Sequence, residues 1–163
     1  MTSEFASDCS NCAALCCMAL AFDEGEMFGH DKPAGLPCHR LDRMSCSIHE
    51  DLEVKGYRGC VAFECLGAGQ RVTAMFSENW RRDPALTTPM MNAFRAMRSV
   101  QELHQMMLAA RALPLPDEKL GELTAWGETL EGAKTDIESL TSFDTKPARD
   151  WLKSLAPFIS RAE

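Results

Sequence analysis

Eight cysteines crowd into the first 65 residues of this 163-residue chain, and none follows them. Thiolates are soft ligands that select zinc, iron–sulfur clusters or Cu(I), and a closed site commonly uses four of them. The spacing, a C-x2-C-x3-CC cluster followed by four dispersed cysteines, is typical of metal ligation rather than of isolated buried thiols. We therefore predict that all eight bind metal: Cys9, Cys12, Cys16, Cys17, Cys38, Cys46, Cys60 and Cys65.

Helical geometry divides the first cluster. At about 100° per residue, a helix would bring Cys9, Cys12 and Cys16 to one face and turn Cys17 away from it. Three sulfurs on one face suit the corners of an iron–sulfur cube, and we expect the fourth ligand from the loop 60–65. The remaining cysteines would hold a second ion or shield the first.

Two other interpretations stay open, a framework of disulfides and a set of inert thiols. Disulfides need an oxidising compartment, whereas the N-terminus MTSEFASDCSNC lacks the basic and apolar segments of a secretory signal and favours the cytoplasm. The net charge of −7 argues against nucleic acid or an anionic membrane as a partner. Residues 1–70 hold five Lys/Arg and eleven Asp/Glu, so a bound cation would relieve the repulsion among added thiolates.

The distribution of glycines, prolines and apolar residues along the chain predicts a mainly α protein with two domains. Residues 1–72, interrupted by glycines and prolines, should form a small metal-stapled module with little regular structure. Its one strand candidate is Cys60–Phe63. Residues 73–163 should form a short antiparallel helical bundle packed on it, because apolar residues recur at steps of three and four. We expect helices over 89–113, over 117–140 with a break near the middle, and over 145–159.

The cysteine segments resemble a known family. CSNCAALCC, DKPAGLPCHRL, CSIH and GCVAFECLGAG, within about residues 9–70, are similar to the YkgJ-like CxxCxxxCC cysteine-cluster family, described as zinc- or iron-chelating proteins. The stretch continuing through GAGQRVTAMF and NWRRDP also resembles the N-terminal part of some bacterial pentapeptide-repeat proteins, although no such repeats follow. A related motif in flagellin lysine methylases is associated with a four-iron cluster. The resemblance implies a chelating module.

A few other residues qualify as supporting groups. His39 and His49 lie among the cysteines and could be ligands or contact them, while Gly67 and Gly69 would let backbone amides approach sulfur. No catalytic motif occurs, so we assign no catalytic residue and favour a non-enzymatic protein. Methionines concentrated between Met75 and Met107 suggest a surface for a protein partner or for self-association.

The sequence thus favours a cysteine-ligated protein that carries an iron–sulfur cluster of the 4Fe-4S type. Its role would be structural, redox-sensing or partner-docking. The alternatives are a structural protein with one or two Zn²⁺ ions, a Cu(I) or metal-trafficking protein, and an electron-transfer accessory of an enzyme system.

Overall fold

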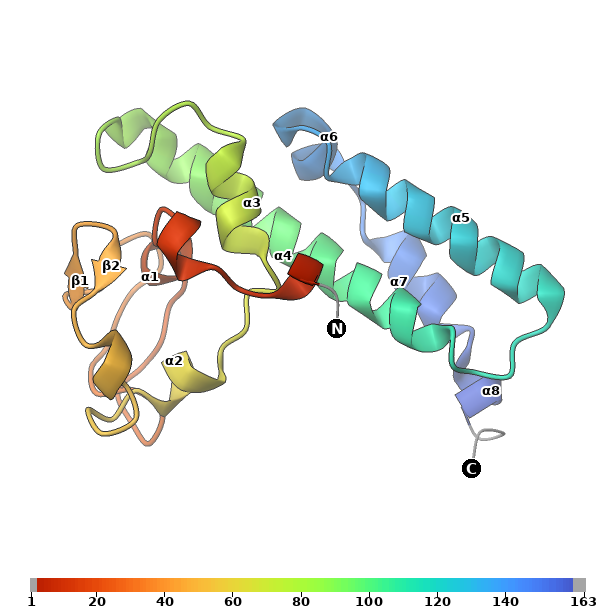
Figure 1. The fold of residues 1–163 in the computed structure, drawn as a ribbon, viewed down its shortest axis with the longest axis horizontal. Coiled ribbons are helices and arrows are strands. Elements are labelled where there is room, and N and C mark those ends of the chain that lie inside the picture. Colours follow the sequence, from red (N-terminus) through yellow and green to blue (C-terminus); the bar gives the residue numbers. More distant parts are fainter. Residues whose placement is uncertain (1–2, 160–163) are drawn as a thin grey trace. The chain divides into compact units, whose positions relative to one another are not determined.

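A computed structural model describes residues 3–159 as a mainly helical protein with very little strand (Figure 1). The predicted fold class is confirmed, since a cysteine-rich region with little regular structure precedes packed helices. The chain divides into two compact units, Met1–Arg95 and Ala96–Glu163, which are described separately. This division falls inside a helix. The domains 1–72 and 73–163 stay a prediction, and their outer ends lie outside the described residues.

The first unit consists of short elements joined by turns. In chain order these are η1 (Ser3–Phe5), η2 (Cys9–Asn11), α1 (Leu15–Ala19), β1 (Leu41–Asp42), β2 (Ser45–Cys46), η3 (His49–Asp51), α2 (Arg58–Ala62), α3 (Ala68–Ala74), η4 (Pro84–Leu86) and the start of α4 (Thr87–Ala110). The strand expected at Cys60–Phe63 is wrong, because most of that segment belongs to α2. Strands β1 and β2 instead form a tight antiparallel hairpin, with Arg43 in the left-handed conformation at its turn.

The segment from Cys9 to Cys17 is not one helix, as the angular analysis had assumed. It begins in the 3-10 turn η2, becomes extended at Cys12, and passes through a left-handed Ala14 (φ 54°) before α1 begins. The Ala13 amide, which a helix would pair within the segment, donates instead to the Thr73 hydroxyl at 2.9 Å. Tertiary hydrogen bonding thus replaces the local helix, so the angular spacing of the cysteines does not apply.

The buried apolar side chains of the first unit lie close in sequence to the first cysteines and on the following helices. α1 contributes Leu15 and Met18, and α3 contributes Val72. Trp80 is also buried, and its indole N–H donates to the carbonyl of Ala13 at 2.7 Å. This hydrogen bond ties the chain just after Cys12 to the loop that precedes α4.

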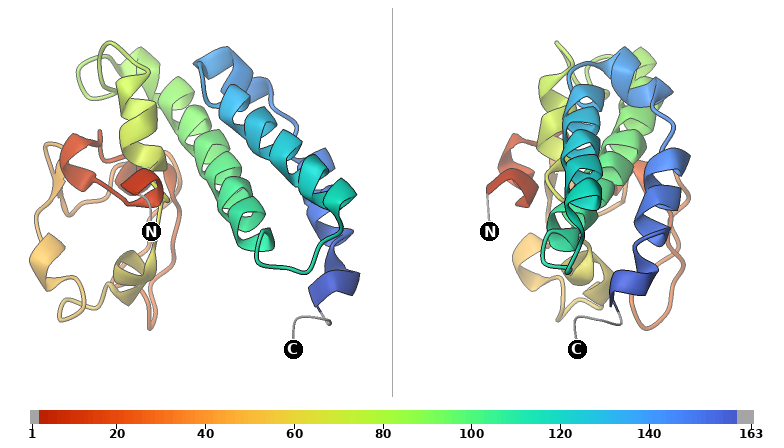
Figure 2. Two further views of the ribbon diagram at one scale, coloured as in Figure 1. Left: turned by 45° about the vertical axis from the view of Figure 1, so that its right-hand side comes forward. Right: turned by 90° about the vertical axis from the view of Figure 1, so that its right-hand side faces the viewer.

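The second unit is a small antiparallel bundle. It contains the later part of α4, α5 (Asp117–Ala133), α6 (Ile137–Ser142), α7 (Lys146–Lys153) and α8 (Ala156–Ile159). Figures 1 and 2 show α5 running back beside α4, after a turn that contains Pro114 and Pro116. The predicted break near the middle of 117–140 is wrong. α5 continues past Gly127 and ends at Ala133, and Asp136 then caps α6 by accepting from the Ser139 amide at 2.8 Å.

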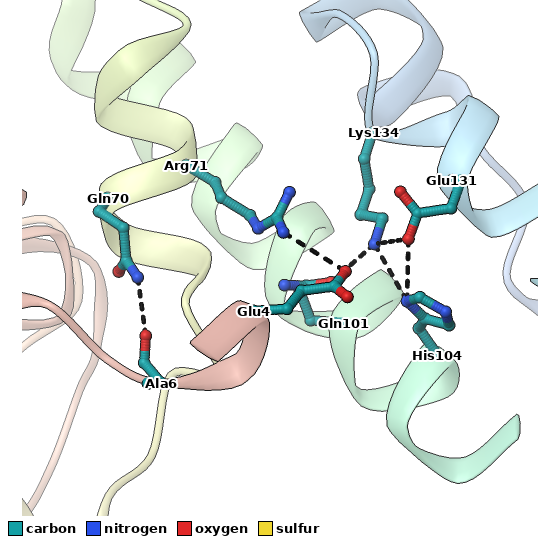
Figure 3. A network of polar contacts seen from close by, with 8 residues as sticks. All are labelled: Glu4, Ala6, Gln70, Arg71, Gln101, His104, Glu131 and Lys134. Carbon is teal, nitrogen blue, oxygen red and sulfur yellow. Dashed lines mark hydrogen bonds and ion pairs between the residues drawn. The ribbon is translucent and has the colours of Figure 1, made fainter. Parts of the chain in front are cut away.

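A buried lysine fixes α5 against α4 within this unit. The Lys134 ammonium, whose side chain is only 2% exposed, contacts Gln101 Oε1 at 3.0 Å and His104 Nδ1 at 3.1 Å on α4 (Figure 3). It also pairs with Glu131 at 2.6 Å. None of the helices among residues 3–159 is long and apolar enough to cross a membrane.

Three of the methionines that suggested a partner surface are in the interior. Met90, Met97 and Met107 are each at most 2% exposed, whereas Met106 is exposed. These three side chains fill the apolar stripe of α4 that the sequence pattern predicted, so they offer nothing to a partner. Association with another protein or with a second copy stays a prediction without that support.

Candidate metal centre

Four cysteines from two distant segments line one small cavity. Cys9, Cys12 and Cys16 come from the N-terminal segment, and Cys65 comes from the loop before α3. The other lining residues are Asp8, Gly69, Gln70 and Phe94. Three of the sulfurs belong to half-buried residues, while Cys9 is exposed. We refer to Cys9, Cys12, Cys16 and Cys65 as the first thiol group.

Helix α3 holds the N-terminal segment in place. Its Gln70 side chain donates to the carbonyl of Ala6 at 2.7 Å and accepts from the Asp8 amide at 3.2 Å. Arg71 forms an ion pair with Glu4 at 3.3 Å (Figure 3). These contacts position the chain immediately before Cys9.

Gly69, at the start of α3, lies directly against two of the sulfurs. A Cβ atom at this position would stand 2.6 Å from Cys12 Sγ and 3.9 Å from Cys65 Sγ. Gly67 has a different role, because its φ of +76° is a left-handed conformation and a Cβ there would lie 2.7 Å from the Glu4 carbonyl. Of the two glycines named from the sequence, Gly69 contacts the thiols, and Gly67 shapes the turn that leads to it.

Backbone and hydroxyl groups hydrogen-bond the sulfurs of this group. The Cys12 sulfur accepts from the amides of Leu15 and Ala14, and the Ser7 hydroxyl lies 2.9 Å from Cys65 Sγ. Burial nevertheless raises the pKa of Cys12 to about 11, and burial together with the neighbouring sulfurs raises the pKa of Cys9. Without a cation, Cys9 and Cys12 therefore hold their protons. A bound metal would displace those protons, and the ligated sulfur would accept the same amide hydrogen bonds.

We refer to the other four cysteines, Cys17, Cys38, Cys46 and Cys60, as the second thiol group. The Cys38 amide donates to the Cys17 carbonyl at 3.0 Å, and the β1–β2 hairpin that follows carries Cys46 opposite Leu41. Burial, and then the nearby sulfurs of Cys16, Cys38 and Cys46, together raise the pKa of Cys60 to about 11. The same neighbours Cys16, Cys38 and Cys46 act on Cys17.

Adjacent residues in α1 join the two groups. Cys16 and Cys17 have their sulfurs 4.0 Å apart. The hydrogen bond from Cys17 lowers the pKa of Cys16, and the same hydrogen bond raises the pKa of Cys17. Within this pair, Cys16 is therefore the thiol that ionises more readily.

The histidines selected from the sequence are peripheral. His39 and His49 are both exposed, and His49 lies beside Cys46 in a shallow surface depression. The imidazole in contact with a sulfur is that of His30, whose Nε2 lies 3.9 Å from Cys38 Sγ. His30 is fixed from its other side by the buried Tyr57, whose hydroxyl lies 2.9 Å from His30 Nδ1.

A buried cation faces the junction of the two groups, and sequence reasoning missed it. Lys32 is only 4% exposed, and its ammonium donates to the carbonyls of Met18, Leu20 and Pro33. Burial lowers the pKa of Lys32, whereas the sulfurs of Cys38, Cys17 and Cys16 oppose that shift. The sequence did carry a signal for this residue, because Lys32 is one of only five Lys and Arg residues in the acidic, cysteine-rich segment 1–70.

Comparison with known proteins gives one partial likeness. The chain is 42% identical over 107 residues to "Uncharacterized protein YybG" of Bacillus subtilis (strain 168). That match covers 64% of this chain and 37% of YybG, so the chain spans little more than a third of the relative's length. No protein-family model matches the chain, and no solved structure matches it.

Proposed function

We propose that this chain is a cysteine-ligated metal-binding protein that carries an iron–sulfur cluster on the first thiol group, Cys9, Cys12, Cys16 and Cys65. The observation behind the proposal is the convergence of these four thiols, from two segments distant in sequence, on one cavity. Four thiolates are the usual ligand set of a 4Fe-4S cluster. The protein would act in the cytoplasm in a structural, redox-sensing or partner-docking role.

The surroundings of the sulfurs support thiolate ligation. Amides of Ala14 and Leu15 and the hydroxyl of Ser7 can hydrogen-bond ligated sulfur, and such bonds tune the potential of a cluster. The absence of a side chain at Gly69 leaves room beside Cys12. The resemblance of the cysteine segments to YkgJ-like zinc- or iron-chelating proteins supports the same class of function.

The spread of the thiols favours a cluster over one zinc ion. Thiolates around a tetrahedral zinc ion, at a Zn–S distance of about 2.3 Å, lie about 3.8 Å apart. Among the described residues, no three cysteine sulfurs all lie within 4.8 Å of one another. One zinc ion would have to draw the thiols together, whereas a cube of four irons binds each thiolate at a separate corner.

Anaerobic purification followed by absorption spectroscopy and by iron and sulfide analysis tests the proposal. We expect brown protein with broad sulfur-to-iron absorption near ~400 nm. Replacing Cys65 by Ser should remove the cluster on the first thiol group, while Ser10→Ala, an exposed change next to Cys9 that removes no thiol, should keep it. Colourless protein that holds stoichiometric zinc, after expression with ample iron, would contradict the cluster and favour a structural zinc protein.

A further inference from the structure

The second thiol group has the composition of a complete site of its own. We propose that Cys17, Cys38, Cys46 and Cys60 bind a second thiolate-ligated metal centre, separate from the one on the first thiol group. This inference extends the proposed function to a second site in the same module and shares only the thiolate chemistry with it. A soft metal is the class of ligand that four thiolates select. The spread of the sulfurs that favours a cluster at the first thiol group applies here too, and zinc is the other outcome of the test.

Backbone hydrogen bonds link the elements that carry three of these four thiols. Cys17 ends the first cysteine cluster, and its carbonyl accepts the amide of Cys38 at 3.0 Å. The Cys38 carbonyl in turn accepts the amide of Leu41, which begins the hairpin that carries Cys46. Cys60 lies on α2, and its amide donates to the carbonyl of Tyr57 at 3.0 Å.

The Tyr57 side chain leads back to the same group through His30. Arg40 Nε can only donate, so it donates to the Tyr57 oxygen, at 3.4 Å. A Tyr57 hydroxyl that donates to His30 Nδ1 leaves the proton of a neutral imidazole on Nε2. That N–H points to Cys38 Sγ at 3.9 Å. The chain of donors therefore ends on a sulfur, as it does where an imidazole or amide supports a ligated thiolate.

Charge in this region favours an anionic centre. Four thiolates on Zn²⁺, or on a cube of charge +2, leave a net charge of −2. The buried Lys32 ammonium is attracted by the sulfurs of Cys38, Cys17 and Cys16, and its hydrogen bonds to backbone carbonyls hold it in position. A fixed buried cation offsets part of the charge that a tetrathiolate centre introduces.

The adjacent pair Cys16 and Cys17 gives a reason for two centres rather than one. Cys16 lines the cavity of the first thiol group, whereas Cys17 bonds through its backbone to Cys38. In two-cluster ferredoxins the fourth cysteine of a compact cysteine run likewise ligates the other cluster. Because Cys16 belongs to one group and the adjacent Cys17 to the other, the eight thiols divide into two sets of four.

Metal counting on single-thiol variants of the full chain tests the inference. Protein purified without air is analysed for iron, zinc and acid-labile sulfide, and native mass spectrometry counts the centres in each molecule. The wild type should hold two centres. Cys46→Ser, on the hairpin, and Cys60→Ser, on α2, should each lose the same centre and keep the other. Cys9→Ser and Cys65→Ser should show the reverse, and Ser45→Ala, beside Cys46, should retain both.

The outcomes separate this inference from the proposed function. Four further irons with sulfide identify the second centre as a cluster, and one equivalent of zinc identifies it as an ion; either supports the site if Cys46→Ser removes it. One centre that Cys46→Ser and Cys60→Ser leave intact would refute the second site, while the proposed function stands. One centre that variants of both groups abolish would refute the division. A centre that depends only on the second group would support this inference and contradict the proposed function.

Discussion

Replacing Gly69 by Ala tests whether Cys12 binds metal without removing any thiol. The new Cβ would stand 2.6 Å from Cys12 Sγ, whereas ordinary contact begins near 3.4 Å, so the sulfur must recede by about 0.8 Å. In the metal-free protein the half-buried Cys12 side chain can move. In the metal-bound protein the bond to the metal holds the sulfur, so the collision persists.

We expect Gly69→Ala to weaken metal binding by about 10- to 100-fold, the range that outer-shell changes at metal sites typically cause. The free energy of unfolding of the metal-free protein should change much less. Alanine is favoured over glycine in a helix by about 0.5–1 kcal/mol, which offsets part of the cost of moving Cys12. Anaerobic competition against a chelator gives the affinity, and urea denaturation of the metal-free protein gives the stability.

Gly127→Ala is the matched control. It makes the same change within α5, where a Cβ would meet nothing within 4 Å, so it should stabilise its helix and leave metal affinity unchanged. Equal metal affinity in wild type and Gly69→Ala would refute the assignment of Cys12 as a ligand. Equal losses of stability with and without metal would show that Gly69 serves packing alone.

Two further predictions concern hydrogen bonds that hold each unit together. Lys119 and then Trp151 hold the pKa of Glu122 below its ordinary 4.5, so this stabilisation is present above that pH and is lost as the pH falls through the folded value. Glu122→Gln should lower the thermal midpoint at neutral pH, and by progressively less as the pH falls below 4.5. A lowering that does not change with pH would contradict the ionic role. Trp80→Phe leaves the Ala13 carbonyl without its 2.7 Å donor and should cost about 1–3 kcal/mol in urea denaturation, while an unchanged midpoint would show that water replaces the indole.

The helical half was predictable because burial there follows local periodicity. The apolar stripe of α4 is a repeat of three and four residues, and Met90, Met97 and Met107 are buried as that repeat requires. The sequence placed the break before α6 too early, near the middle of 117–140, because glycines lower helix propensity there. The break lies instead between Ala133, where α5 ends, and Asp136, whose carboxylate caps the start of α6. An aspartate three residues before Ser139 was the capping signal available in the sequence.

The cysteine half was predictable in composition and in part of its grouping, but not in local geometry. Spacing grouped Cys9, Cys12 and Cys16 with a ligand from the loop 60–65, and Cys65 of that loop does line their cavity. The single helix assumed for that grouping was wrong, because the local backbone depends on contacts across many residues. The hydroxyl of Thr73 and the indole of Trp80, for example, take the peptide groups of Ala13 that a local helix would have used. No periodicity encodes such bonds. His39, next to Cys38 in sequence, was favoured as a supporting residue, yet the fold turns His30 to that sulfur.

The last prediction concerns Lys32, because burying an ammonium is costly unless something nearby is negative. Its carbonyl partners satisfy its hydrogen bonds but carry no net charge, and the groups that oppose the lowering of its pKa are the sulfurs of Cys38, Cys17 and Cys16. When those sulfurs carry metal the centre is anionic, and the ammonium stabilises it. Lys32→Met, which keeps much of the volume, should therefore weaken metal binding by the second thiol group by at least about tenfold, an effect of about 1.4 kcal/mol. Metal content and chelator competition measure it, with unfolding of the metal-free protein as the reference. Unchanged affinity together with a large loss of metal-free stability would show that Lys32 only braces the backbone carbonyls.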